Sequence, residues 1–309
     1  MMPSAKQPKL LIVILGPTAV GKTAFSIEVA KYYSTEIISC DSRQIFKELN
    51  IGVARPGPDE LAAATTHFIA TRSIHEPYSA GQFAADAIPK LHTLFEQHNK
   101  VICCGGSMLY IEALLNGFDH LPSDENIRKQ LNQRLKNEGL HQLQEQLRDL
   151  DPEYYSAADI SNPHRVIRAL EVCIMSGKKY SELRTGNKTP LPFAICKIGL
   201  KMEREELRKR IDARVDQMFE AGLLEEVKAL HAWRHLQSLN TVGYKELFDY
   251  IDGKISLEHA RELIKTHTAQ FAKRQMTWWK RDSTLQWIDM GNKVDWDGIK
   301  NWMESFHPQ

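Results

Sequence analysis

A glycine-rich turn near the N-terminus has the residue types and the spacing of a phosphate-binding loop. The segment "GPTAVGKT" matches the pattern G-x-x-x-x-G-K-[ST]. Its glycines allow backbone N–H groups to point toward phosphate oxygens, and a helix starting there adds partial positive charge. The lysine supplies a point charge to the outer phosphate, and the threonine hydroxyl can ligate Mg²⁺. We therefore predict a diphosphate- or nucleotide-binding cradle, with Mg²⁺ at Thr23, made of Gly16, Pro17, Thr18, Ala19, Val20, Gly21, Lys22 and Thr23.

A carboxylate and a hydroxyl are expected close to this cradle. The segment "EIISCDSRQIF" puts Asp41 at the carboxyl end of a predicted strand, where ligands bind in open α/β sheets. A carboxylate there can accept a proton from a nucleophile while the cradle holds the donor's phosphates. In "GGSMLY", Ser107 can donate to a transition-state oxygen or a substrate phosphate. Both residues have a structural alternative, since each can cap the helix expected after it.

The further motifs of nucleotide hydrolases are absent. A GTPase needs D-x-x-G between the cradle and N-K-x-D, but no aspartate between Thr23 and the "NKVD" at Asn292 has glycine three residues on. A motor ATPase usually has an acidic residue ending a later apolar strand, whereas the strand "VICC" runs into "GGS". These absences disfavour NTP hydrolysis and favour group transfer, with a small-molecule kinase as one form of it.

Basic residues form two further groups. In "EELRKRIDARVDQMF", Arg210 and Arg214 are four residues apart on a predicted helix, where one could reach a diphosphate. The stretch "LIKTHTAQFAKRQMTWWKR" has basic residues, including Lys273 and Arg274, beside aromatic ones and contains no acidic residue. Basic residues beside aromatic rings suit a nucleic-acid backbone or an unstacked base. A solvated helix face is the alternative for both groups.

Strands and helices that alternate along the chain must position these residues. Leu10 to Leu15, Glu36 to Cys40, "KVICC" and "AICKIGL" are short apolar runs typical of buried strands, and helical segments such as Thr23 to Tyr33 separate them. The pattern predicts an α/β fold with a doubly wound parallel sheet of the P-loop NTPase type.

A helical insertion interrupts this alternation. One helix begins at Ser123 or Asp124, and another is opened by Asn162-Pro163 and stopped by Gly177. We predict a helical insertion domain at residues 122–192. Residues 1–121 and 193–309 would then form the α/β core with C-terminal helices.

The composition is that of an ordinary globular protein. The chain has 309 residues, 42% of them hydrophobic, and a net charge of +1, so a nucleic-acid surface must come from local clustering. The apolar run near the start is too short to span a membrane. Five cysteines without a C-x-x-C pair indicate a reducing compartment rather than a disulfide framework or a zinc site. We expect a cytoplasmic monomer with no membrane partner.

Taken together, the motifs resemble the tRNA dimethylallyltransferases, the tRNA isopentenyltransferase or IPP transferase family, bacterial enzymes that prenylate the adenine just 3′ of the anticodon. The resemblance rests, in this order, on "GPTAVGKT", "ISCDSRQIF", "IGVARP", "GGSMLYIEALLNG", "NPHRVIRALEV", "RIDARVDQMFEAGLLEEV", "TVGYKEL" and "AKRQMTWW". It implies that the cradle holds the diphosphate of dimethylallyl diphosphate. The acceptor would be N6 of an adenosine flipped out of the anticodon stem-loop of tRNA.

The resemblance also implies roles for individual residues. Asp41 resembles the general base, and Lys22, Thr23 with Mg²⁺ and Arg214 resemble the groups that stabilise the departing diphosphate, so the expected catalytic residues are Asp41, Lys22, Ser107 and Arg214. The residues expected to contact tRNA are Asp41, Ser42, Arg43, Gln44, Ser107, Arg128, Arg165, Val166, Ile167, Arg168, Lys273 and Arg274. The insertion would be a mobile, tRNA-binding domain.

The chain departs from the family pattern in places. Ser107 stands where threonine is common but keeps the hydroxyl, while Val53 and Arg55 replace a more usual threonine and lysine. No chemistry is assigned to His67 or His75. The alternatives to tRNA prenylation are prenyl transfer to a free adenine nucleotide, a small-molecule P-loop kinase and a non-catalytic, nucleotide-gated RNA-binding module.

Overall fold

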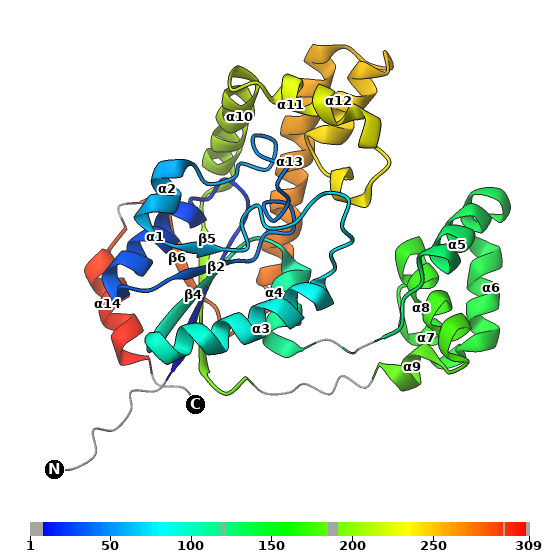
Figure 1. Cartoon of the computed structure of the whole chain (residues 1–309), viewed down its shortest axis with the longest axis horizontal. Helices are drawn as coiled ribbons and strands as arrows, with labels where there is room; N and C mark the ends of the chain where they lie inside the picture. The colour runs from blue at the N-terminus through cyan, green and yellow to red at the C-terminus, as the bar shows by residue number, and fades with distance from the viewer. Residues whose placement is uncertain (1–8, 118, 120, 185–190, 293, 307–309) are drawn as a thin grey trace. The chain divides into compact units, whose positions relative to one another are not determined.

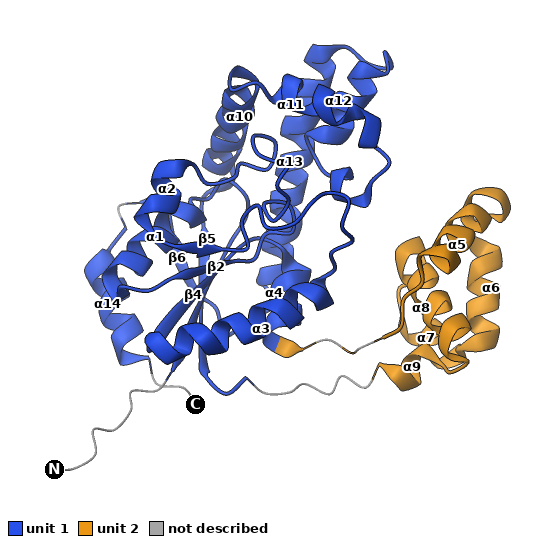
Figure 2. Cartoon of the chain, viewed as in Figure 1, with its two compact units in different colours: residues 1–115, 191–309 blue, residues 116–190 orange. Residues whose placement is uncertain are grey.

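The computed structural model describes residues 9–117, 119, 121–184, 191–292 and 294–306 (Figure 1). The chain divides into two compact units, which are coloured separately in Figure 2. Unit 1 comprises residues 1–115 and 191–309, and unit 2 comprises residues 116–190. No helix within the described residues combines the length and apolarity needed to cross a bilayer.

A six-stranded sheet of parallel strands forms the centre of unit 1, in the order β3-β2-β4-β1-β5-β6. Its strands are β1 (Leu10–Leu15), β2 (Ile37–Ser39), β3 (Thr66–His67), β4 (Lys100–Cys104), β5 (Ala194–Lys201) and β6 (Gln286–Asp289). The predicted parallel α/β sheet is confirmed. The short edge strands β3 and β6 were not anticipated from the sequence, because neither has the apolar run that marked the inner strands.

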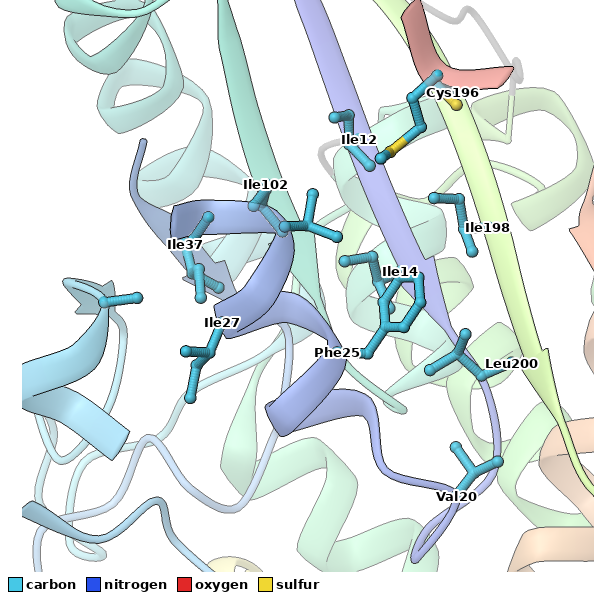
Figure 3. Packing of buried hydrophobic residues seen from close by; sticks show 14 of the residues in the cluster. Ile12, Ile14, Val20, Phe25, Ile27, Ile37, Ile102, Cys196, Ile198 and Leu200 are labelled. Atoms are coloured by element: carbon cyan, nitrogen blue, oxygen red, sulfur yellow. The ribbon is translucent and has the colours of Figure 1, made fainter. Parts of the chain in front are cut away.

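Both faces of the sheet are covered, which explains why β1 is apolar throughout. Alternate β1 residues point to opposite faces, so Ile12 and Ile14 pack with the helix after the cradle while Leu11 and Val13 pack on the other side. Figure 3 shows Ile12 and Ile14 with Phe25 of that helix. The helices of unit 1 are α1 (Lys22–Tyr33), α2 (Pro58–Ala63), α3 (Ala80–Gln97), α4 (Met108–Asn116), α10 (Arg204–Glu220), α11 (Leu223–Leu230), α12 (Tyr244–Ile251), α13 (Leu257–Trp279) and α14 (Trp296–Ser305), with short 3₁₀ turns η1 (His231–Trp233) and η2 (Gln237–Leu239).

A separate apolar cluster joins the C-terminal helices to the loop that follows β2. Ile45 and Leu49 from that loop pack with Val215 of α10, Leu247 of α12 and Ile264 of α13, all of them buried. Since α10 also contacts α13, this cluster holds the post-β2 loop against a rigid helical layer.

Unit 2 is a small helical bundle with its own core. It contains α5 (Glu125–Glu138), α6 (Leu140–Leu150), α7 (Pro152–Ala157), α8 (Pro163–Ser176) and α9 (Tyr180–Leu183). Asp124 caps α5 and Asn162 caps α8 through side-chain oxygens, and Gly177 ends α8 in the left-handed conformation. These start and stop signals are as predicted.

Candidate active site

The phosphate cradle connects β1 to α1, and its two glycines are needed for different reasons. Gly21 has φ 104° and directly precedes α1, a backbone conformation that favours glycine. At Gly16 a Cβ would lie 2.7 Å from the carbonyl oxygen of Leu200 on β5, so the turn can pack on the sheet only without a side chain. The sequence GPTAVGKT therefore forms the expected turn between a buried strand and a helix N-terminus.

The side chain of Lys22 folds back onto this turn. Its Nζ donates to the carbonyl oxygens of Gly16 (3.0 Å) and Pro17 (2.7 Å). Burial lowers the pKa of Lys22 to about 8; the nearby Arg214 charge acts in the same direction, and Cys104 and Asp41 partly oppose it. The ammonium is therefore still mostly charged at neutral pH but loses its proton more easily than an exposed lysine, and a bound anion would stabilise the charged form.

Asp41 follows β2 at the same carboxyl edge of the sheet. Its Oδ1 accepts hydrogen bonds from the backbone N–H groups of Arg43 (2.8 Å) and Gln44 (3.2 Å). Residues 42–45 form turns rather than a helix, so Asp41 caps a turn and not the helix considered as an alternative. Among the described residues, its Oδ2 has no hydrogen-bond partner, which leaves that oxygen open to accept a proton.

Ser107 holds the turn that carries Asp41. Its Oγ accepts from the backbone N–H of Ser42 (2.8 Å) and donates to the Ser42 hydroxyl (3.1 Å). Its own N–H donates to the carbonyl oxygen of Cys40 (3.2 Å). The serine therefore joins the loop after β4 to the loop after β2.

Arginine side chains from α10 reach the cradle. Arg214 donates from Nη1 to the Thr18 hydroxyl at 3.4 Å, and burial lowers its pKa. The Nη1 atom of Arg210 lies 3.9 Å from the position that a Cβ on Gly21 would take. Both members of the predicted i, i+4 pair thus lie beside the turn that is predicted to bind phosphate.

A cavity of about 910 Å³ opens next to Arg214. Its walls come from the loop after β2, α2, the segment around β3 and α10, and they include both apolar and polar side chains. The lining residues include Ile51, Ala54, Leu61, Ile69, Arg214 and Met218. An apolar group attached to a diphosphate in the cradle could extend into such a space.

The side chains of Arg43 and Gln44, which are both expected tRNA contacts, make internal hydrogen bonds. The Arg43 guanidinium donates to the carbonyl oxygens of Gln237, Ser238 and Asn240. The Gln44 amide donates to the carbonyl oxygens of Val53 (3.2 Å) and Ala54 (2.8 Å). Both side chains hold neighbouring loops next to Asp41, and their contact with RNA stays a prediction.

Two basic residues of α13, Lys273 and Arg274, lie at the surface without an ion pair among the described residues. Both are exposed, and Arg274 lies 5.7 Å from the Phe271 ring centre. Lys265, in the same stretch, is neutralised by Asp216 at 2.9 Å. The charges of Lys273 and Arg274 are therefore available to a polyanion.

In unit 2, some of the expected tRNA contacts lie in the core of the bundle and others lie at its surface. Arg128 and Arg168 both bind the buried carboxylate of Glu171, at 2.9 and 2.8 Å. The side chains of Val166 and Ile167 are buried in the bundle core. Arg165 is exposed, 3.7 Å from Asp159.

Sequence reasoning missed Gln275, which lies in the middle of the basic stretch on α13. Its side chain is 2% exposed and contacts the cradle. The signal was present, because Gln275 shares a helical stripe with the buried residues Ala272 and Trp279. A polar residue in an apolar stripe indicates a hydrogen-bonded interior position.

Comparison with known proteins gives consistent results. The model of the IPP transferase family matches residues 44–282. The chain is 51% identical over 280 residues to the tRNA dimethylallyltransferase of Christiangramia forsetii, covering 90% of this chain and 93% of that one. It is 49% identical to tRNA dimethylallyltransferase 1 of Bacteroides thetaiotaomicron, covering 90% and 91%.

Solved structures agree with these relatives. The full-length tRNA isopentenylpyrophosphate transferase of Bacillus halodurans is 35% identical, with a TM-score of 0.71 and 96% of each chain covered. A eukaryotic dimethylallyltransferase acting on tRNA has a TM-score of 0.78 at 24% identity, covering 97% of this chain and 81% of that one, and so supports the fold.

Proposed function

The chain belongs to the IPP transferase family and is a prenyltransferase of that class, and we propose that it transfers a dimethylallyl group from dimethylallyl diphosphate to tRNA. The acceptor is N6 of the adenosine 3′-adjacent to the anticodon, and diphosphate is released. One observation carries the proposal: the phosphate cradle with Lys22 and Arg214, and the carboxylate of Asp41, lie at the same edge of one sheet.

The reaction forms a bond between N6 and the allylic carbon and breaks the bond from that carbon to the diphosphate oxygen. The electron pair leaves with the diphosphate, where cradle N–H groups, Lys22 and Arg214 stabilise the developing negative charge. The N6 proton passes to the open oxygen of Asp41. An adenine amine is a poor nucleophile, so holding it close to the allylic carbon and removing its proton both contribute.

The residues at the cradle fit a magnesium ion. Thr23 is the second residue of α1 and its side chain is partly exposed. The described residues contain no group of three or more His, Cys, Asp or Glu side chains that could hold a metal, so the Thr23 hydroxyl, diphosphate oxygens and water would be the ligands. Mg²⁺ accepts such an oxygen set. When bound, it supplies charge neutralisation on the leaving group.

We also infer where the RNA binds. The exposed, unpaired Lys273 and Arg274 on α13 suit the phosphates of the anticodon stem-loop. Arg165 and the partly exposed Arg128 and Arg168 of unit 2 are the corresponding candidates there. We propose that the protein acts as a cytoplasmic monomer, with the target adenosine reaching the turn at residues 41–44.

The test is direct. Purified protein, Mg²⁺ and dimethylallyl diphosphate are incubated with an anticodon stem-loop RNA, and mass spectrometry of the RNA should show one added dimethylallyl group. The matched control replaces the target adenosine by inosine, which lacks the N6 amine and should gain nothing. Modification of AMP alone would indicate the free-nucleotide reaction, and phosphate transfer from ATP without prenylation would indicate a kinase.

A further inference from the structure

The buried side chain of Gln275 connects the loop after β1 to the loop after β4. Its Oε1 accepts from the backbone N–H of Thr18 in the phosphate cradle at 2.8 Å. Its Nε2 donates to the carbonyl oxygen of Gly106 at 2.9 Å. Because Gln275 is 2% exposed, water competes weakly for either bond, and both contribute to loop geometry.

These bonds complete a continuous path from the cradle to the carboxylate. Thr18 binds Gln275, Gln275 binds Gly106, and the next residue, Ser107, binds Ser42, which directly follows Asp41. The path therefore runs from the loop that would hold the diphosphate to the group that would take the proton.

We propose that Gln275 is a positioning residue that sets the distance between the diphosphate site and the acceptor site. The inference rests on the proposed function, since it assigns the two ends of the path to donor and acceptor. Displacement of reacting groups by about 1 Å can cost roughly 10²-fold in rate. A bridge made from a helix is well suited to prevent such displacement, since sites built on rigid elements are held more precisely than sites on loops.

A glutamine can make both bonds without binding a proton. Thr18 N–H requires an acceptor and the Gly106 carbonyl requires a donor, and a glutamine side chain presents one of each. Glutamate keeps the acceptor but places a second oxygen against the Gly106 carbonyl. Methionine has a similar length and supplies neither bond.

The lack of a side chain at Gly106 leaves room for this amide. Its φ is not positive, so its backbone conformation does not require glycine. Instead, a Cβ there would lie 2.3 Å from Nε2 of Gln275 and 3.6 Å from Nζ of Lys22. The amide leaves no room for the added carbon, whereas the contact with Lys22 would be an ordinary one. Gly106→Ala is thus expected to act by displacing the Gln275 amide.

The first experiment measures steady-state and single-turnover kinetics of Gln275→Met and Gln275→Glu on stem-loop RNA. We expect Gln275→Met to lower kcat by about 10-fold to 10²-fold while the RNA Kd and the donor KM change little. The kcat of Gln275→Glu should lie between those of the unmodified protein and Gln275→Met, because glutamate keeps the bond to Thr18. A purely structural role would instead lower the melting temperature and the active fraction and leave kcat per active molecule intact, which would overturn the proposal.

The second experiment is a double-mutant cycle. Gly106→Ala alone should lower kcat as Gln275→Met does. In the Gln275→Ala background the space is free, so adding Gly106→Ala should cost little more. If the two losses in kcat add fully, Gly106 is needed for another reason, and the proposed role of the Gln275 bridge is refuted.

A third measurement does not depend on activity. The Thr18 amide should exchange its hydrogen slowly in the unmodified protein and in Gln275→Glu, and fast in Gln275→Met. If the unmodified protein prenylates no RNA, the proposed function fails, and Thr18 exchange still decides whether the bridge exists. Equal exchange in all three proteins would refute it.

Discussion

Asp41 combines a structural and a chemical position in one carboxylate. Oδ1 is held by two backbone N–H groups, and Oδ2 is without a partner among the described residues. The bonds to Oδ1 orient the group, and the open oxygen can accept a proton. Capping and proton transfer, which are alternatives when only the residue type is known, are therefore compatible here.

We expect Asp41→Asn to lower the rate of prenyl transfer by about 10²-fold or more, because an amide oxygen is a poor base. The asparagine oxygen still accepts from Arg43 and Gln44 N–H, so the turn and the RNA affinity should persist. Single-turnover kinetics and RNA-binding titrations measure the two effects. Asp59→Asn, at an exposed carboxylate on α2, is the matched control, and near-normal turnover by Asp41→Asn would exclude Asp41 as the base.

The lowered pKa of Lys22 predicts a pH dependence. In the free enzyme burial lowers the pKa to about 8, so the charged form is lost as pH rises through that value. We expect kcat/KM for the donor to be constant below pH 8 and to fall by about tenfold per pH unit above it, because kcat/KM reports free-enzyme pKa values.

Two controls test this prediction. A bound diphosphate stabilises the ammonium, so the fall in kcat should occur at higher pH than the fall in kcat/KM. In Lys22→Arg the guanidinium stays charged, and whatever activity remains should lack the alkaline fall. An unmodified enzyme with constant donor kcat/KM up to about pH 10 would contradict the assignment.

At the scale of elements, the loops after three adjacent parallel strands carry the site, and helices from the C-terminal third position them. Strands β2, β4 and β1 are neighbours in the sheet, so their carboxyl-end loops meet. Helix α10 supplies Arg214 to Thr18, and α13 supplies Gln275 to the same residue. Helix α13 thus has a buried face that contacts the cradle and an exposed face on which Lys273 and Arg274 have no ion pair with any described residue.

We expect the exposed face of α13 to bind RNA phosphates. Lys273→Ala and Arg274→Ala should each weaken stem-loop binding about equally across RNA sequences and reduce the slope of log K against log salt by about one. Filter binding over a salt series measures both effects. Lys31→Ala, at the last turn of α1, is the control and should leave the slope unchanged. The same slope in all four proteins would place the RNA elsewhere.

At the scale of the whole molecule, unit 2 has a stabilising centre of its own. The Glu171 carboxylate is fully buried and binds Arg128 of α5, Arg168 of its own helix and the backbone N–H of Asp124. Burial alone would raise the pKa of Glu171, but these hydrogen bonds outweigh burial and lower it. The cluster ties the start of α5 to α8.

We expect Glu171→Gln to destabilise unit 2 by about 1–3 kcal/mol, because a buried amide replaces a carboxylate that binds two partly exposed arginines. Amide exchange in α5 and α8 should accelerate at neutral pH. A carboxyl whose folded pKa is lowered stabilises above its unfolded pKa of about 4.3, and this stability is lost as pH falls through the folded value.

On acidification, the protection factors of α5 and α8 amides in the unmodified protein should therefore approach those in Glu171→Gln. Glu138→Gln, at a half-exposed ion pair on the surface of α5, is the control and should change exchange little. If Glu171→Gln leaves exchange in both helices unchanged, the buried cluster contributes nothing to the stability of unit 2.

Local signals in the sequence determined the inner strands, several helix ends and the identity of the chemistry, but not the short edge strands β3 and β6. The run from Leu10 to Leu15, the turn of Gly16 to Thr23 and the caps at Asp124 and Asn162 depend on neighbouring residues, so pattern and spacing suffice to predict them. The ordered motifs then indicated the family, which the comparisons confirm.

The tertiary structure alone decided which side chains complete the site. Gln275 meets Thr18 across 257 positions of chain and Gly106 across 169, and no local pattern encodes a partner at such separation. The same holds for Arg128, for which the family resemblance implied an RNA contact and whose guanidinium is held by Glu171. Residue type records what a group can do, whereas its partner depends on long-range packing, which exists only in the folded chain.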